Sequence, residues 1–331
     1  MLFHPAIMAL LLADALTLIL LLPAGLFALR LLRHWDLNSG SARQIRLERQ
    51  TYLVATVLGF VFAVQLLSLL LLVFTADRLA VQFVGAMCAV GTFNVNPFGF
   101  PALFLKLALF FLASAWLFMN HVDNRAPDYP LTRVKYGLLL IVLPVAALAA
   151  VVQVRYFLGL RADVITSCCG SLFSGEKTVT AELAGMPPLQ AMIGFYSVLG
   201  ATVLGGLFAL WRRRGALVFS ALSALAFPVA IAAVIAFLSL YIYEHPHHHC
   251  PFCLLKAEYG YVGYLVYLPL FAASALGVAL GVTLPFARAA TLAPVMARIT
   301  PRVVAMATGL FMLCMVLFTW FSWRSNLVLL G

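Results

Sequence analysis

Residues 52–75 read YLVATVLGFVFAVQLLSLLLLVFT, a run of 24 residues that contains no Lys, Arg, Asp or Glu. A helix of about 20 apolar residues is what the hydrocarbon core of a bilayer requires. Because lipid offers no hydrogen-bond partner, the backbone of such a segment has to bond to itself, which favours an α-helix. This run therefore predicts a membrane-spanning helix.

Seven further stretches of the 331-residue chain have the same character, and 64% of all residues are hydrophobic while only 10% are charged. This composition is typical of a polytopic membrane protein and excludes a soluble domain. We predict an all-α fold with eight transmembrane helices, which together form a single membrane domain over residues 1–331. The predicted spans are about 5–29, 52–75, 101–120, 136–154, 189–210, 217–242, 260–285 and 303–322.

The basic residues are distributed unevenly among the connecting loops. Fourteen of the 21 Lys and Arg residues fall on one side of the predicted helices. The positive-inside rule places this side in the cytoplasm and both chain termini outside. Because four short loops share these charges, the net charge of +10 reflects topology, and we expect a lipid bilayer but no nucleic acid as a partner. The topology also leaves open a weak repeat of four helices plus four.

The first helix is not predicted to be a cleavable signal, since its basic residues follow it and Asp14 interrupts its apolar run. Five of the six cysteines lie in the three outer loops, at about 76–100, 155–188 and 243–259. Cysteines gathered on an outer face are typical of an oxidising compartment. We therefore predict a multi-pass protein of an inner (plasma) membrane, with its functional loops facing a periplasm. These cysteines are Cys88, Cys168, Cys169, Cys250 and Cys253.

The third outer loop carries the densest chemistry of the chain, the string HPHHHCPFC over residues 245–253. Two cysteines at this spacing can close a small disulfide ring. We expect the N-terminus of the next helix to stabilise the thiolate of Cys250. The neighbouring histidines and Lys256 would add positive charge, so that Cys250 and Cys253 would form an oxidising redox pair.

The same loop offers ligands for a metal ion. Imidazole and thiolate groups suit Zn²⁺ or copper, and a tetrahedral site needs only four of them. A structural disulfide or structural zinc that staples the loop is the third interpretation. The candidate ligands are His245, His247, His248, His249, Cys250 and Cys253.

The string CPFCLLK, residues 250–256, resembles the membrane thiol oxidases of the DsbB type. In that family a CxxC opens a transmembrane helix, and a basic residue follows it near a bound quinone. The resemblance covers seven residues, Lys256 stands one position before the family's usual Arg, and the family has four helices instead of eight. It implies that Cys250 and Cys253 pass electrons to a quinone. No haem is expected, because no histidine lies in the middle of a predicted span.

The second outer loop contains the adjacent pair Cys168 and Cys169. A disulfide between neighbouring residues is strained, so one of the two is expected to bond to Cys88 or to the CxxC. Such a cysteine would relay electrons between the CxxC and a periplasmic thioredoxin-like or other thiol protein. The pair also resembles the adjacent cysteines of mercury-uptake membrane proteins. One structural disulfide with one unpaired cysteine is the alternative.

Four polar residues are candidates for a quinone site or a proton route. Asn94 and Asn96 would either bond to a quinone carbonyl or shape a turn. Asp14 and Lys106 lie inside predicted helices, where ionisable side chains are costly and usually functional. As the alternative, Lys106 would reach the membrane interface and Asp14 would bond to helix backbone.

These features lead to three hypotheses, and the sequence does not decide whether the protein is an enzyme. The first is a membrane thiol–disulfide oxidoreductase that exchanges electrons between the outer cysteines and a quinone. The second is a soft-metal transporter or metal-handling protein for copper, zinc or mercury. The third is a non-catalytic subunit of a larger respiratory or assembly complex.

Overall fold

The computed structural model describes residues 3–36, 39–161, 163–164, 166, 185–327 and 329. Within these residues the chain is helical and has no β-strand, and eight helices are long and apolar enough to cross a membrane. The predicted all-α fold with eight transmembrane helices is confirmed, and the protein is a multi-pass membrane protein. Which membrane it occupies and which side its loops face stay predictions, as does the repeat.

Short helical segments join or extend the long helices. The span that begins with α9 continues through the π-helical segment η2 and the short helix α10. The long helices are α1 (Pro5–His34), α2 (Ala42–Leu79), α4 (Gly99–Asp123), α5 (Thr132–Leu158), α8 (Pro188–Arg212), α9 (Ala216–Ala233), α11 (Val262–Thr283) and α12 (Ala293–Arg324). The short ones are η1 (Ala80–Gln82), α3 (Ala89–Phe93), η2 (Val234–Leu238), α10 (Ser239–Tyr243), η3 (Cys253–Leu255), η4 (Ala257–Tyr259) and η5 (Leu284–Phe286).

Two helices extend well past their predicted spans. The helix α2 begins at Ala42, ten residues before the apolar run, and α12 begins at Ala293, ten residues before its predicted start. Both added segments contain arginines. A hydropathy pattern finds only the part of a helix that lies in lipid, so it misses the polar turns at the end of the same helix.

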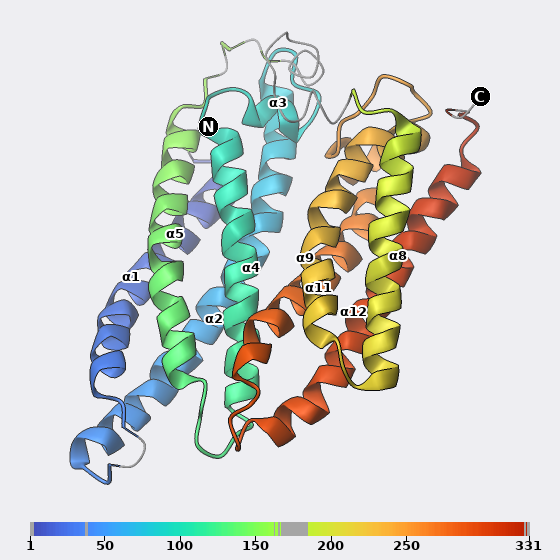
Figure 1. Cartoon of the computed structure of the whole chain (residues 1–331). Coiled ribbons are helices and arrows are strands. Elements are labelled where there is room, and N and C mark those ends of the chain that lie inside the picture. Colours follow the sequence, from blue (N-terminus) through green and yellow to red (C-terminus); the bar gives the residue numbers. More distant parts are fainter. Residues whose placement is uncertain are drawn as a thin grey trace. The chain divides into compact units, whose positions relative to one another are not determined.

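The described chain divides into two compact units (Figure 1). Unit 1 contains α1, α4, α5 and nearly all of α2. Unit 2 contains α8 to α11, most of α12, and the segment that follows α2. In residues, unit 1 is Met1–Ala76, Phe93–Ala162 and Val282–Ile299, and unit 2 is Asp77–Thr92, Asp163–Gly281 and Thr300–Gly331.

Unit 1 is built on the packing of α5 against both α1 and α4. Gly25 lets α1 approach α5 closely, since a Cβ there would lie 2.8 Å from Leu143 Cδ2. Phe62 and Trp116 meet edge to face with ring centroids 5.0 Å apart. Tyr136 is fully buried, and its hydroxyl donates to the carbonyl of Thr51 at 3.0 Å. Small residues and satisfied polar groups are how helices associate in lipid.

Unit 2 uses small residues in the same way. A Cβ at Gly277 of α11 would lie 2.3 Å from Ser223 Cβ of α9. A Cβ at Gly206 of α8 would lie 2.0 Å from Thr308 Oγ1 of α12. These contacts leave no room for a larger residue, so the helices pack at short range along these faces.

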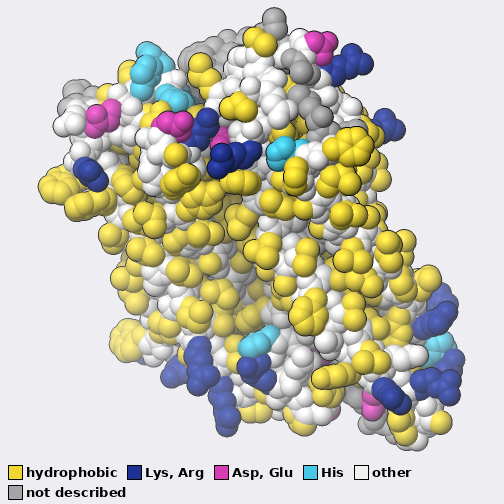
Figure 2. Space-filling view, turned by 180° about the vertical axis from the view of Figure 1, so that it is seen from behind, with side chains coloured by type: hydrophobic (Ala, Val, Ile, Leu, Met, Phe, Trp, Pro, Cys, Tyr) yellow, Lys and Arg dark blue, Asp and Glu magenta, His cyan; other side chains and the backbone are white. Residues whose placement is uncertain are grey.

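The lipid-facing surface is apolar over both units. Figure 2 shows hydrophobic side chains along the middle of the helices, with charged and histidine side chains toward the helix ends. On α1, for example, Leu12, Leu16 and Ile19 are exposed, while Leu10 and Leu21 are fully buried. This spacing gives the helix one face for lipid and one for the protein interior.

The turn between α4 and α5 is held by a buried ion pair. Asp123 Oδ2 accepts from Lys135 Nζ at 2.7 Å and from Thr132 Oγ1 at 3.2 Å. Asp123 Oδ1 accepts from the backbone N–H of Leu131 at 2.7 Å. Lys135 also donates to Asn120 Oδ1 at 3.0 Å. Both carboxylate oxygens therefore accept hydrogen bonds, and the ion pair links α4 to α5.

We predict that Asp123→Ala destabilises the protein by about 3–5 kcal/mol, because it leaves the ammonium of Lys135 buried without its counter-charge. The double variant Asp123→Ala/Lys135→Met is expected to recover most of this loss. Thermal unfolding in detergent, followed by circular dichroism, measures both. If Asp123→Ala were as stable as the wild type, the stabilising role of the Asp123–Lys135 ion pair would be contradicted.

Candidate functional site

The segment that carries Cys88 is fixed at several points, all within unit 2. Thr166 clamps it: its N–H donates to the carbonyl of Val84 at 3.0 Å, and its hydroxyl donates to that of Gly91 at 2.9 Å. Gly85 has a φ of +83°, and a Cβ there would lie 2.1 Å from the carbonyl oxygen of Thr166. Only glycine fits this turn, because its φ and its space both exclude a side chain.

Two charged side chains hold the backbone on either side of Cys88. The carboxylate of Asp77 accepts a hydrogen bond from the backbone N–H of Ala89, where α3 begins. The ammonium of Lys256 donates to the carbonyl of Met87. The position of Cys88 is thus set by contacts to its own neighbours in the chain.

The CxxC segment lies between α10 and α11. The hydroxyl of Tyr243, the last residue of α10, donates to the carbonyl of Cys250 at 2.6 Å. The hydroxyl of Tyr267 in α11 donates to the carbonyl of Pro251 at 2.6 Å. These tyrosines satisfy carbonyls that no regular helix satisfies, so they fix the segment between the two helices.

His249 connects the same segment to the π-helical segment η2. Its Nδ1 lies 2.9 Å from the carbonyl oxygen of Ile235, within Val234–Leu238. A π-helical turn inside an α-helical span disturbs the regular hydrogen bonds and is frequent at functional sites. Here the imidazole ring bonds to a carbonyl of that turn and so fixes the backbone immediately before Cys250.

These contacts bring three cysteines together, and we call them the cysteine triad: Cys88, Cys250 and Cys253. Their sulfur atoms all lie within 4.8 Å of one another, and each residue is at most 4% exposed. Cys88 Sγ lies 3.2 Å from Cys250 Sγ. This is a thiol contact, since a disulfide bond is about 2.05 Å long. The triad joins chain segments 162 residues apart.

Cys250 is a thiol in this environment and not a stabilised thiolate. The hydrogen bond with Cys253 raises the pKa of the Cys250 thiol, and burial raises it further, while the contact with Cys88 lowers it only in part. The expected low pKa is therefore wrong, and so is the expected position of the CxxC at the start of a long helix. Cys253 begins the three-residue segment η3, and α11 begins only at Val262.

The structure does not place the four histidines in the triad. His245 and His247 are exposed, with ring centroids 6.1 Å apart. The ring of His248 lies 4.2 Å from that of Tyr243. Burial lowers the pKa of His248, and the neighbours His245 and His249 lower it further, so its imidazole is neutral near neutral pH. The described cluster of metal-type ligands consists of cysteines alone.

The other predicted residues are distributed as follows. Cys168 and Cys169 lie outside the described residues. Asn96 shapes a turn: its Oδ1 accepts from the N–H of Phe98 at 3.0 Å, and its Nδ2 donates to the carbonyl of Tyr156 at 2.9 Å. Asn94 is half-buried in the same segment. Asp14 and Lys106, in unit 1, form a buried ion pair.

Several residues of the site were not predicted from the sequence. Asp77, Thr166, Tyr243 and Tyr267 all act through backbone groups of the two cysteine segments, and no local pattern marks them. Cys88 was expected to be a disulfide partner or an unpaired cysteine but was not predicted to be a ligand. The one available signal was the repeated occurrence of cysteines on the same predicted face.

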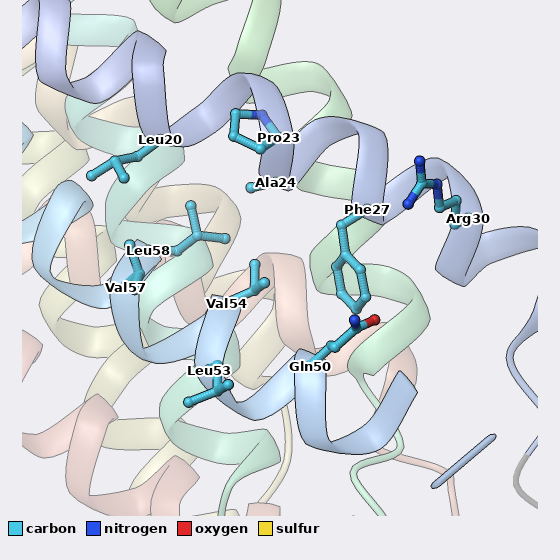
Figure 3. A pocket seen from close by; sticks show the side chains of 10 residues that line it. All are labelled: Leu20, Pro23, Ala24, Phe27, Arg30, Gln50, Leu53, Val54, Val57 and Leu58. Carbon is cyan, nitrogen blue, oxygen red and sulfur yellow. The ribbon is translucent and has the colours of Figure 1, made fainter. Parts of the chain in front are cut away.

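A separate groove lies in unit 1, between α1 and α2 (Figure 3). Its walls include Leu20, Phe27, Val54 and Leu58, with Arg30 among the lining residues. It contains no member of the triad.

No family model matches the chain, and no curated protein or solved structure matches it either.

We predict slow alkylation of Cys250 by iodoacetamide at neutral pH, after reduction and chelation, because the reactive thiolate is scarce when the thiol pKa is raised. The rate should rise roughly tenfold for each pH unit, as the thiolate fraction does below its pKa. Peptide mass spectrometry measures it, with denatured protein as the control. Alkylation at neutral pH as fast as in denaturant would contradict the raised pKa.

Proposed function

We propose that the protein handles a soft metal ion, Cu(I) in the first place, at a site formed by Cys88, Cys250 and Cys253. The observation that supports this most is the gathering of three buried sulfur atoms within 4.8 Å. Thiolate ligands select Cu(I) and Zn²⁺ over harder cations. Three sulfurs suit a trigonal Cu(I) site, or a Zn²⁺ site whose fourth position is open.

The dimensions of the triad fit a common metal ion. Metal–thiolate bonds are about 2.3 Å long, so three sulfurs placed trigonally around one ion are about 4.0 Å apart. The sulfurs of the triad all lie within 4.8 Å of one another, and those of Cys88 and Cys250 lie 3.2 Å apart, so adjustments of about 1 Å bring them to this spacing. Folding therefore already supplies much of the free energy that is needed to bring the three ligands together.

The protonation state of the triad has a consequence for binding. Ligand thiols must lose their protons when the metal enters, so the raised pKa of Cys250 makes binding strongly pH-dependent. Three thiolates around Cu(I) carry a net negative charge. Lys256, which is bonded to the carbonyl next to Cys88, supplies positive charge close to it.

The triad would face the outer side of the membrane in this proposal. Arg212, Arg213 and Arg214 lie just before α9, and the CxxC follows the other end of the same span. The positive-inside rule would put the arginines in the cytoplasm and the triad on the opposite side. The exposed imidazoles of His245 and His247 would then meet an arriving ion first.

A second candidate function is thiol–disulfide exchange, and one observation favours it. Cys250 interacts with both Cys88 and Cys253, so a disulfide could pass between the two pairs without a large movement. A membrane quinone or a periplasmic thiol protein would accept or supply the two electrons. The buried, protonated state of Cys250 makes it a slow nucleophile, which is why we rank this function second.

We expect wild-type protein, purified in detergent under reducing conditions, to retain Cu(I) in stoichiometric amounts after desalting, and Cys250→Ser to lose it. Cys314→Ala is the matched control, because Cys314 is buried in α12 outside the triad. Elemental analysis by mass spectrometry measures the bound metal. A Cys250→Ser protein that binds as much copper as the wild type would overturn the metal proposal.

Peptide mapping without reductant separates the two candidate functions. If the wild type retains no metal and carries a Cys88–Cys250 or Cys250–Cys253 disulfide that re-forms when an oxidised quinone is added, thiol exchange replaces metal handling.

A further inference from the structure

A second cluster of polar residues lies inside unit 1, independent of the triad. Lys106 of α4 is 1% exposed, and its ammonium has three acceptors. These are Asp14 Oδ1 of α1, Gln65 Oε1 of α2 at 3.2 Å and Ser68 Oγ of α2 at 3.3 Å. The three hydrogens of the ammonium are therefore all used in hydrogen bonds to these neighbours.

The carboxylate of Asp14 is satisfied on one oxygen only. Its Oδ1 accepts from Lys106 and from Gln65 Nε2, which lies 3.2 Å away. The same Nε2 also lies 2.7 Å from Thr17 Oγ1. Asp14 is 5% exposed, and its Oδ2 is buried and has no hydrogen-bond partner among the described residues.

The other buried ion pair of unit 1 shows what a fully satisfied carboxylate looks like. Both oxygens of Asp123 accept hydrogen bonds, and Lys135 is one of the donors. That pair lies at a helix–helix turn, whereas Asp14 lies within the span of α1. Burying a carboxylate oxygen without a hydrogen-bond partner costs free energy. A purely structural role therefore does not explain why Asp14 lies within the span of α1.

We propose that Asp14 is a reversible proton-binding site in the membrane interior. A proton from water would bond to Oδ2 and turn it into a hydroxyl group, while Lys106 keeps its three hydrogens. The net charge of the pair would change from zero to +1, and release would reverse it. No electron moves, and the proposal does not depend on metal binding by the triad.

The groove between α1 and α2 lies along the same two helices that carry Asp14 and Gln65. Its lining runs from Arg30 and Gln50 to Leu20 and Leu58, as Figure 3 shows. Leu20 is one helical turn, about 4.5 Å along the axis, from Thr17 of the polar cluster. Pro23 lies in the same wall and has no N–H, so it leaves the carbonyl one turn earlier without its helical donor.

Few titratable groups influence Asp14. On α2 the facing residues Gln65 and Ser68 are uncharged, and on α4 the facing charge is Lys106. The helix α5 packs on α1 and contributes Gln153 and Tyr156 near its C-terminal end. Lys135 and Tyr136 lie near its opposite end. Within the described residues, Lys106 is therefore the charged side chain that contacts Asp14.

The test is infrared difference spectroscopy on the full-length protein in phosphatidylcholine vesicles, between mildly alkaline and mildly acidic buffer. We expect acidification to produce a protonated-carboxyl band in the wild type that Asp14→Asn lacks. Absence of this band from the wild type, or its presence unchanged in Asp14→Asn, would overturn the proposal.

Two further variants guard against misfolding. The double variant Asp14→Asn/Lys106→Met removes both charges and leaves no unpaired buried ammonium, so it is a second protein without Asp14 that should also lack the band. Lys106→Met alone removes the positive charge beside Asp14, so the band should already be present in alkaline buffer. A Lys106→Met spectrum identical to that of the wild type would contradict the role of the pair.

Discussion

The backbone polar groups inside this protein have to find partners within the chain, because the lipid around the helices offers none. The helices satisfy their own backbone, but the segments around Cys88 and Cys250 do not. Their carbonyls are bound instead by Thr166, Lys256, Tyr243 and Tyr267. The same contacts that satisfy the backbone also fix the positions of the cysteines.

The side chains that hold the backbone of the triad are different from the sulfur atoms that would react or bind a metal. None of the four clamping side chains acts as a ligand, so all three sulfurs are left to one another or to an ion. A loop whose cysteines were held only by a disulfide would lose its shape when reduced. Here the backbone is fixed independently of the sulfur chemistry, which suits a site that gains and loses an occupant.

Much of the fold could be predicted from the sequence, because apolar runs such as 52–75 are long and unambiguous. The polar first turns of α2 were missed since hydropathy detects only the lipid-embedded part of a helix. For the candidate site, the CxxC was recognised, but its assumed position at a helix N-terminus was wrong. The residues after Cys253 form two short 3₁₀ segments before α11 begins.

The role of Cys88 and the histidines could not be predicted for a different reason. Cys88 meets Cys250 across 162 residues, and only the packing of unit 2 decides that contact. The histidines were grouped with the cysteines because they are neighbours in the chain. Adjacent side chains point in different directions, so His249 bonds to Ile235 while Cys250 turns toward the triad. Asp14 and Lys106 were recognised from the sequence as costly charges inside the spans, but their contacts with Gln65 and Ser68 depend on how α1, α2 and α4 pack.

The central claim is that the three sulfurs bind one soft metal ion, and X-ray absorption at the copper edge tests it most directly. The protein is loaded with Cu(I) under reducing conditions, and the scattering atoms around the metal are identified. The account predicts a first shell of three sulfur atoms with no nitrogen. A shell dominated by nitrogen would place the metal on the histidines and contradict the triad as the binding site.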